Sequence, residues 1–309
     1  MKILVTGGHG MVGSAFNRVD TTHTIITIGR QDADLANRSE VLSVIDKVEP
    51  DAVIHLAAKV GGVKGNTDFV ADFYTENTLM NTNILDCCHE AGVTKVLSLL
   101  STCIYPDDAV YPLTEDQIHL GPPHVSNFGY AYAKRMLDVH SRALRRQYDR
   151  NYICAVPNNL YGPYDNFDLE NSHVIPAIIR KIWEAKINNS TPIFWGDGSP
   201  LREFTFSDDI AKCLIFLLEK YEDADPVNVG NIGEVSIKQI VEKTCDILDY
   251  KGSIEWDPTK PAGQFRKPSD NSKFIGLGWS NDMYTDFDTG LKVTIDWFKK
   301  NYPNIRGVR

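Results

Sequence analysis

The chain has few of the features that would place it in a membrane or on nucleic acid. Its longest near-apolar runs, such as residues 96–100 and 214–218, are far shorter than the roughly 20 residues that a membrane-spanning helix needs. The 309 residues include 32 Lys and Arg against 41 Asp and Glu, a formal net charge of −9, whereas a protein that coats nucleic acid needs a basic face. The apolar run after Met1 is too short for a secretory signal. We therefore expect a cytoplasmic protein that binds neither membranes nor nucleic acid.

Paired cysteines of the kind that hold a metal or build a compact disulfide framework are also missing. The six cysteines are scattered, and in a cytoplasmic chain each is expected to be a free thiol that packs as a small apolar side chain. We therefore expect neither a metal site nor a disulfide. The cysteines are Cys87, Cys88, Cys103, Cys154, Cys213 and Cys245.

The first half of the chain alternates short β-branched runs with longer segments of helical period. The expected strands, apolar enough to be buried on both faces, are residues 2–6, 24–28, 52–56, 95–100 and 152–156. The expected helices are residues 13–19, 38–48, 69–91 and 130–148. This alternation is typical of an α/β fold of the Rossmann type, a doubly wound parallel sheet with right-handed crossovers.

After Pro157 the pattern loosens. Loops rich in Pro and Gly at 161–171 and 195–202 separate expected helices at 174–185 and 208–221. Further expected elements are a strand at 227–230 and helices at 236–248 and 291–301. We expect residues 1–160 to form a dinucleotide-binding domain, with some later segments returning to it. Residues 161–309 are expected to form mainly a smaller α/β substrate-binding lobe.

A G-x-x-G-x-x-G loop lies between the first expected strand and the first expected helix. Glycines in such a loop allow a tight turn and let a pyrophosphate approach the backbone at the start of the helix. Its position between strand and helix makes the pattern specific for dinucleotide binding. The loop consists of Gly7, Gly8, His9, Gly10, Met11, Val12 and Gly13, of which His9 is expected to be exposed.

The end of the second expected strand indicates which dinucleotide is bound. NAD-specific sites place an acid there for the ribose 2′-OH, whereas NADP-specific sites accommodate the 2′-phosphate with Arg. Arg30 occupies this position, with Asp32 and Asp34 following. We expect NADP(H), and the alternative is that Arg30 is only a solvated surface charge.

Tyr130 and Lys134 form a Y-x-x-x-K pair on an expected helix. Residues at this spacing share a helix face, and a nearby ammonium lowers the pKa of a phenol from about 10. Tyr130 is therefore expected to act as an acid/base. Ser101 follows an expected strand at the edge where open α/β sheets bind their ligands.

These residues resemble those of the extended short-chain dehydrogenase/reductase family, and within it the GDP-L-fucose synthases. The resemblance covers essentially the whole chain. Its specific segments are residues 55–62, 101–106, 127–134, 157–163, 171–176, 195–198 and 202–204. The fold that it implies is the one expected above, with relatives that form homodimers. The helices at 69–91 and 130–148 are the expected dimer interface.

The activity that the resemblance implies is the NADPH-dependent 3,5-epimerisation and 4-reduction of GDP-4-keto-6-deoxy-D-mannose to GDP-L-fucose. The family assigns the proton transfers at C3 and C5 to a Cys and a His, which correspond to Cys103 and His173. Tyr130 would protonate the C4 oxygen, and Ser101 would stabilise negative charge there. In an extended stretch, Ser101 and Cys103 would point toward the same pocket.

The resemblance also implies a cofactor site and a GDP-sugar site. Besides the glycine loop and Arg30, the cofactor set comprises Asp34, Leu35, Leu56, Ala57, Ala58, Leu99, Leu100, Ser101, Thr102, Lys134, Pro157, Asn158, Asn159, Leu160 and His173. The substrate set comprises Lys181, Trp195, Arg202 and Arg266, where cations suit a diphosphate. One departure is Ala262, which replaces an acid of many relatives.

Two other functions stay open. One is a related nucleotide-sugar 4-epimerase or dehydratase, which would hold NAD tightly and consume no NADPH. The other is a non-catalytic protein that senses NADPH. The presence of Ser101, Cys103, Tyr130, Lys134 and His173 argues against a sensor, since a sensor has no use for an acid/base pair.

Overall fold

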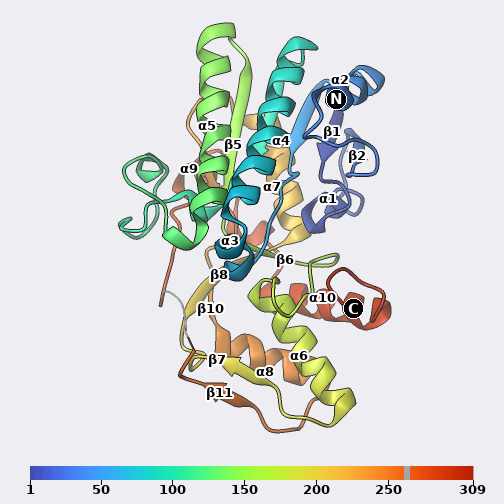
Figure 1. Cartoon of the computed structure of the whole chain (residues 1–309), viewed down its shortest axis with the longest axis vertical. Coiled ribbons are helices and arrows are strands. Elements are labelled where there is room, and N and C mark those ends of the chain that lie inside the picture. The colour runs from blue at the N-terminus through green and yellow to red at the C-terminus, as the bar shows by residue number, and fades with distance from the viewer. Residues whose placement is uncertain (261–264, 309) are drawn as a thin grey trace.

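A six-stranded parallel sheet forms the larger lobe of the protein (Figure 1), whose computed structural model describes residues 1–260 and 265–308. The strand order is β2-β1-β3-β4-β5-β9. The order reverses between β1 and β3, so a ligand crevice is expected at the carboxyl ends of these strands. The expected doubly wound sheet is confirmed. Its strands are β1 (Lys2–Thr6), β2 (Thr24–Ile28), β3 (Ala52–His55), β4 (Lys95–Leu99), β5 (Asn151–Pro157) and β9 (Val227–Val229).

Helices cover both faces of this sheet. Along β1, Ile3 and Val5 pack with one group of helices and Leu4 with the other, because successive side chains of a strand point to opposite faces. All three are fully buried, which explains why the strand is a continuous apolar run. The first group is α1 (Met11–Ala15), α7 (Ser207–Lys220) and α9 (Ser272–Gly276), and the second is α2 (Arg38–Val48), α4 (Val70–Glu90) and α5 (Phe128–Tyr148).

The smaller lobe lies below the large sheet in Figure 1 and has its own aromatic core. Phe194, Phe204 and Phe298 are each nearly fully buried in it. One sheet has the order β10-β8-β6 and another pairs β11 with β7. The strands are β6 (Asn159–Tyr161), β7 (Ile193–Trp195), β8 (Leu201–Phe206), β10 (Glu234–Ser236) and β11 (Glu255–Asp257), and the helices are α6 (Val174–Asn188), α8 (Ile237–Leu248) and α10 (Phe287–Asn301).

The chain passes repeatedly between the two lobes. After β5 it enters the smaller sheet as β6, and later β9 pairs with β5 at the edge of the large sheet. Helix α7 likewise packs on the large sheet with α1. Segments that follow residue 160, such as β9 and α7, thus contribute to the larger lobe. The domain boundary at residue 160 stays a prediction.

Most of the expected elements of the larger lobe are confirmed, whereas the strands of the smaller lobe were missed. The expected loop at 195–202 is wrong at both ends, because Trp195 lies in β7 and Leu201 begins β8. Helix α3 (Val63–Asp68) was not expected. The 3-10 turns are η1 (Thr102–Ile104), η2 (Glu115–Gln117), η3 (Val125–Asn127) and η4 (Asn281–Met283).

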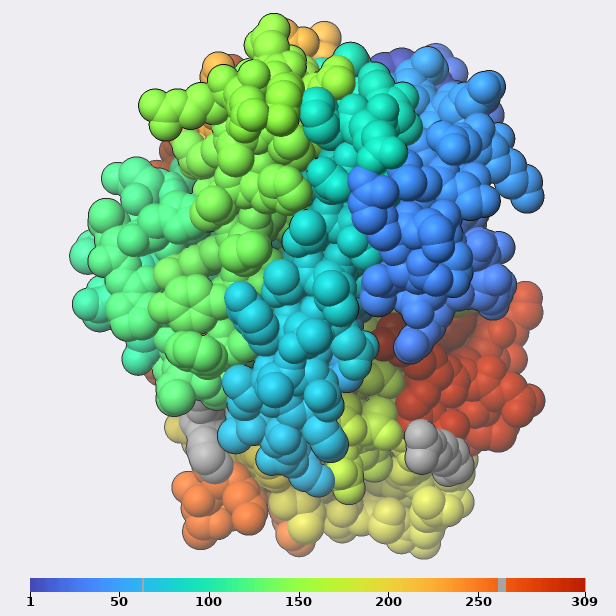
Figure 2. Space-filling view, turned by 45° about the horizontal axis from the view of Figure 1, so that its top comes forward, coloured from blue at the N-terminus to red at the C-terminus, as the bar shows by residue number. Residues whose placement is uncertain are grey.

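Helices α4 and α5 pack side by side over one face of the large sheet and form much of the surface seen in Figure 2. Several apolar side chains on them are exposed, among them Leu79 at 45% and Val139 at 52%. Along the described residues, every helix is too short or too polar to cross a bilayer.

Candidate active site

The glycine loop between β1 and α1 leaves no space for side chains. Gly7 has a φ of +71°, which favours glycine, and a Cβ there would lie 2.9 Å from the backbone nitrogen of Ala57. A Cβ on Gly13 would lie 2.2 Å from the carbonyl oxygen of Gly7. The bare backbone thus forms a close-packed turn at the carboxyl end of β1, which fits the approach of a dinucleotide pyrophosphate.

The end of β2 carries charged side chains of both signs. Arg30 is exposed just beyond β2. The His9 ring lies against Gly29, where a Cβ would be only 2.1 Å from His9 Nδ1. The Asp32 carboxylate accepts a 2.8 Å hydrogen bond from Gly29 N and lies 3.9 Å from His9 Nε2. Arg30 and His9 therefore lie at the end of β2, the position at which this fold would bind an adenosine 2′-phosphate. The Asp32 carboxylate there is already hydrogen-bonded to the backbone.

A series of buried polar contacts holds the backbone at the carboxyl ends of β1 and β3. Thr6 Oγ1 accepts hydrogen bonds from the backbone nitrogens of Leu56 and Ala57, both at 3.2 Å, and lies 2.8 Å from Nδ1 of His55. Burial, reinforced by the charge of Lys134, lowers the pKa of His55 to about 3, so the imidazole is neutral. These contacts fix the backbone after β3, including two residues of the expected cofactor set.

Ser101 and Cys103 lie together after β4. The Ser101 side chain caps the turn η1 and accepts a 3.4 Å hydrogen bond from the backbone nitrogen of Cys103. The expected extended stretch is wrong, because residues 102–104 form a 3-10 helix. The two side chains interact nonetheless, and the Ser101 hydrogen bond partly offsets the burial that raises the pKa of the Cys103 thiol.

Tyr130 and Lys134 share one face of α5, as their spacing predicts. Lys134 Nζ lies 5.9 Å from the centre of the Tyr130 ring. The ammonium is directed to the backbone, where it donates a 2.7 Å hydrogen bond to the carbonyl oxygen of Leu99 at the end of β4. The side chain is only 2% exposed, and burial lowers its pKa to about 8.

The expected effect of Lys134 on Tyr130 is wrong in this structure. Burial raises the pKa of the Tyr130 phenol above its ordinary value, with a smaller contribution from Cys103. The lysine charge does not compensate, because its hydrogen bond goes to Leu99 and not to the phenol. A phenol that keeps its proton is suited to donate it, as the acid of a carbonyl reduction must.

His173 lies in the smaller lobe, exposed at the start of α6. It occupies the N-cap position of α6, but its side chain makes no capping hydrogen bond to that helix. Its charge acts on the buried Asp165, whose pKa burial raises and His173 lowers. One Asp165 oxygen accepts from Asn166 N at 2.7 Å, and the other is buried without a partner. Sequence reasoning missed Asp165, which lies between the 157–163 and 171–176 segments of the resemblance.

The expected substrate residues lie on the smaller lobe. Lys181 donates to the carbonyl oxygen of Ile193 at 2.9 Å, and Arg202 donates to that of Leu201 at 2.7 Å. Burial lowers the pKa of both. Trp195 is 62% exposed at the end of β7. Arg266 is paired with Glu234 at 2.6 Å, so it would have to leave this partner to bind a substrate, and Ala262 lies outside the described residues.

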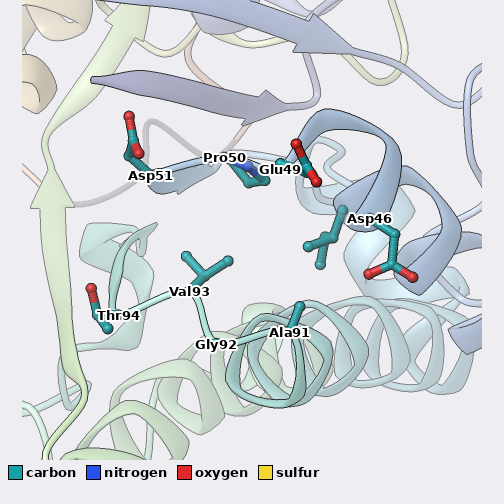
Figure 3. Close-up of a pocket in the computed structure, with 9 residues that line it drawn as sticks. Asp46, Glu49, Pro50, Asp51, Ala91, Gly92, Val93 and Thr94 are labelled. Atoms are coloured by element: carbon teal, nitrogen blue, oxygen red, sulfur yellow. The ribbon is translucent and has the colours of Figure 1, made fainter.

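A hollow of about 740 Å³ opens at the opposite, amino-terminal edge of the large sheet (Figure 3). It lies between the end of α2 and the turn that follows α4. The carboxylates of Asp46, Glu49 and Asp51 line it and would repel a phosphate anion. This hollow is therefore unsuited to a dinucleotide, and the candidate site stays at the carboxyl edge.

Comparisons with known proteins show the family to which the chain is similar. The model of the NAD dependent epimerase/dehydratase family matches residues 3–233. A GDP-L-fucose synthase from Dictyostelium discoideum is 40% identical, covering 98% of this chain and 97% of that protein. One from Escherichia coli is 34% identical over 99% of both chains. A solved GDP-L-fucose synthetase from Naegleria fowleri, bound to NADP, has a TM-score of 0.93 at 38% identity, covering 98% of this chain and 94% of that one.

Proposed function

The chain belongs to the NAD dependent epimerase/dehydratase family and within it to the GDP-L-fucose synthases, and from this membership we propose how its residues perform that activity. The enzyme converts GDP-4-keto-6-deoxy-D-mannose to GDP-L-fucose with NADPH. The observation that carries this function is that the match spans almost the full length of both chains. In addition, Ser101, Cys103, Tyr130 and Lys134 lie together at one edge of the large sheet.

The glycine loop, Arg30 and the backbone after β3 would hold NADP(H). The glycines allow the tight turn, because a Cβ on Gly7 or Gly13 would meet backbone atoms, and the pyrophosphate would lie against this turn at the carboxyl end of β1. Arg30, with His9 beside it, would pair with the 2′-phosphate. When bound, NADPH supplies the hydride that reduces C4 of the sugar.

Cys103 and His173 would move the protons at C3 and C5. The C4 keto group acidifies both positions, because the negative charge left by a lost proton is delocalised onto the C4 oxygen. Each inversion needs a base on one face of the ring and an acid on the other. The thiol lies in η1 of the larger lobe and the imidazole at the start of α6 in the smaller lobe, and the two groups would act on opposite faces of the sugar ring.

Tyr130 would donate its proton to the C4 oxygen during reduction. The raised pKa of its phenol keeps this proton in place until negative charge develops on the sugar. Ser101 would donate a hydrogen bond to the same oxygen and stabilise it in all three steps. Lys134, hydrogen-bonded to the carbonyl oxygen of Leu99, would hold α5 against the end of β4 and contribute positive charge to the site.

Lys181, Trp195, Arg202 and Arg266 would bind the GDP part of the substrate. Lys181 and Arg202 are cations held by backbone carbonyls and partly buried, which strengthens their attraction for a diphosphate. Trp195 offers an exposed ring against which a base or sugar stacks.

A homodimer is our proposal for the assembly. Its interface would be the outer surface of α4 and α5, where exposed apolar side chains such as Phe128, Met136 and Val139 follow one side of α5. A cytoplasmic location is consistent with six free cysteines, five of which are buried.

The function is tested by mixing the purified protein with NADPH and GDP-4-keto-6-deoxy-D-mannose. NADPH absorbance measures the reduction, and NMR of the product shows its stereochemistry. Stoichiometric oxidation with GDP-L-fucose as product is the expected result. Oxidation that yields only the unepimerised 6-deoxy sugar would remove Cys103 and His173 from their roles, and no oxidation with tightly held NAD would favour a 4-epimerase.

A further inference from the structure

Lys267 reaches from the smaller lobe to the backbone beside Cys103. Its Nζ donates a 3.1 Å hydrogen bond to the carbonyl oxygen of Thr102, which belongs to the peptide unit that joins Thr102 to Cys103. The two residues are 165 positions apart in the chain, and Lys267 is half-buried there. A cation is thus held against the turn that carries the thiol.

A buried clasp holds the segment on which Lys267 lies. The Glu203 carboxylate, only 3% exposed on β8, accepts hydrogen bonds from Ser269 Oγ at 2.5 Å and from Ser269 N at 3.2 Å. On the other side, the carbonyl oxygen of Pro268 accepts from Leu113 N at 2.9 Å. The Glu203–Ser269 clasp therefore fixes the backbone immediately after Lys267 to both lobes.

The charged and titratable groups that act on Cys103 come from two elements. Tyr130, Lys134 and Arg135 belong to α5, and Lys267 comes from the segment described above. Lys134 and Arg135 are bound to the carbonyl oxygens of Leu99 and Ile104, each at 2.7 Å. Burial raises the pKa of the Cys103 thiol, whereas Lys267 and Lys134 lower it.

We propose that Lys267, fixed by the Glu203–Ser269 clasp, is a positioning residue that stabilises the thiolate of Cys103. An ammonium bound to the backbone of the turn that carries a thiol favours the ionised form of that thiol, and more strongly where water is excluded. The effect on epimerisation rests on the function proposed above. The effect on the thiol itself is independent of any substrate.

The test is the pH dependence of Cys103 alkylation by iodoacetamide in the full-length protein without substrate, followed by mass spectrometry of the Cys103 peptide. Only the thiolate reacts, so the midpoint of the profile measures ionisation, and the plateau at high pH measures access. Lys267→Met is expected to raise the midpoint by about one pH unit, and Lys267→Arg to keep it near the wild-type value. Ser269→Ala is expected to raise it by a smaller amount.

Lys273→Met is the matched control, because Lys273 is a nearby lysine whose amine binds Pro226 instead. Its midpoint should equal that of the wild type. A Lys267→Met midpoint equal to the wild-type one would overturn the proposal, even if turnover fell, and would assign Lys267 to substrate binding. A shifted midpoint in an enzyme that does not turn over the GDP-sugar would uphold the proposal while contradicting the proposed function.

Discussion

His55 Nε2 and Asn81 Oδ1 lie 3.1 Å apart in the fully buried layer between β3 and α4. With the Thr6 hydroxyl at Nδ1, the arrangement suits a neutral imidazole whose proton is on Nε2. Asn81 in turn donates to the carbonyl oxygen of Ala133 at 2.9 Å, next to Lys134. Strand β1, which leads into the glycine loop, and helix α5, which carries Tyr130 and Lys134, are thereby joined through one chain of buried polar contacts.

This buried histidine predicts a pH-dependent stability. The folded-state pKa of His55 is about 3 against 6.5 ordinarily, so below about pH 6.5 the unfolded chain binds a proton that the folded protein refuses. The contribution of the neutral His55 to the free energy of unfolding is therefore complete above pH 6.5. It is lost as the pH falls toward 3, by up to about 1.4 kcal/mol per pH unit. Chemical unfolding of wild type and His55→Gln should show a shallower loss for the variant. His124→Gln, at an exposed site, should retain the wild-type slope, and equal slopes for all three would contradict the prediction.

Tyr130→Phe is expected to lower the rate of C4 reduction by about 10²–10⁴-fold. The phenol proton is lost while the ring and its edge contact with Phe73 remain, so NADPH affinity should stay within about twofold. Stopped-flow NADPH oxidation and a separate fluorescence titration distinguish the two effects. Tyr132→Phe, on the same helix, serves as the control with near-normal reduction. Normal reduction by Tyr130→Phe would assign the proton to another donor.

Cys103→Ser is expected to abolish epimerisation and leave NADPH binding intact. A serine hydroxyl preserves the size of the side chain, but its proton is too tightly held for it to act as a base at neutral pH. Solvent deuterium at C3 and C5, read by NMR, should fall by at least about 100-fold. Cys245→Ala in the smaller lobe should catalyse deuterium incorporation at the wild-type rate. A wild-type rate in Cys103→Ser would refute the role of Cys103 in proton transfer.

Arg30→Ala is expected to weaken NADPH binding by about tenfold, or about 1.4 kcal/mol, with little effect on NADH. The reason is that only NADPH carries the 2′-phosphate that the guanidinium can pair with. His9→Ala should show the same selectivity with a smaller loss. Lys47→Ala, which removes an exposed charge at the end of α2, is the control. An equal loss of affinity for NADPH and NADH would contradict a contact between Arg30 and the 2′-phosphate.

The sequence predicted the larger lobe well because its elements are set by local patterns. Strands β1 and β2 and helix α2 have the expected bounds, since a strand buried on both faces is apolar throughout and Asn37 caps α2 with its side chain. Strands β6 and β8 were missed. β6 has only three residues, and β8 begins in a stretch rich in Gly and Pro that predicts a loop. The two strands pair with each other across more than 40 intervening positions, so no local pattern marks their pairing.

The membership of the candidate site stays a prediction, whereas the structure corrects part of its expected electrostatics. The Tyr130–Lys134 spacing correctly placed both residues on one face of α5. The sequence could not show that Lys134 would bind the Leu99 carbonyl, nor that burial would outweigh its charge at the phenol. The motifs assigned no role to Lys267, because its contact with Thr102 depends on how the two lobes meet.

The interlaced path of the chain has a consequence for how the protein can be divided. A fragment that ended at residue 160 would lack β9, so β5 would become the edge strand of the sheet, paired only with β4. It would also lack α7, leaving apolar side chains such as Val5 and Ile54 uncovered on one face of the sheet. Neither lobe is thus a transferable module, and we expect the two to unfold in a single cooperative transition.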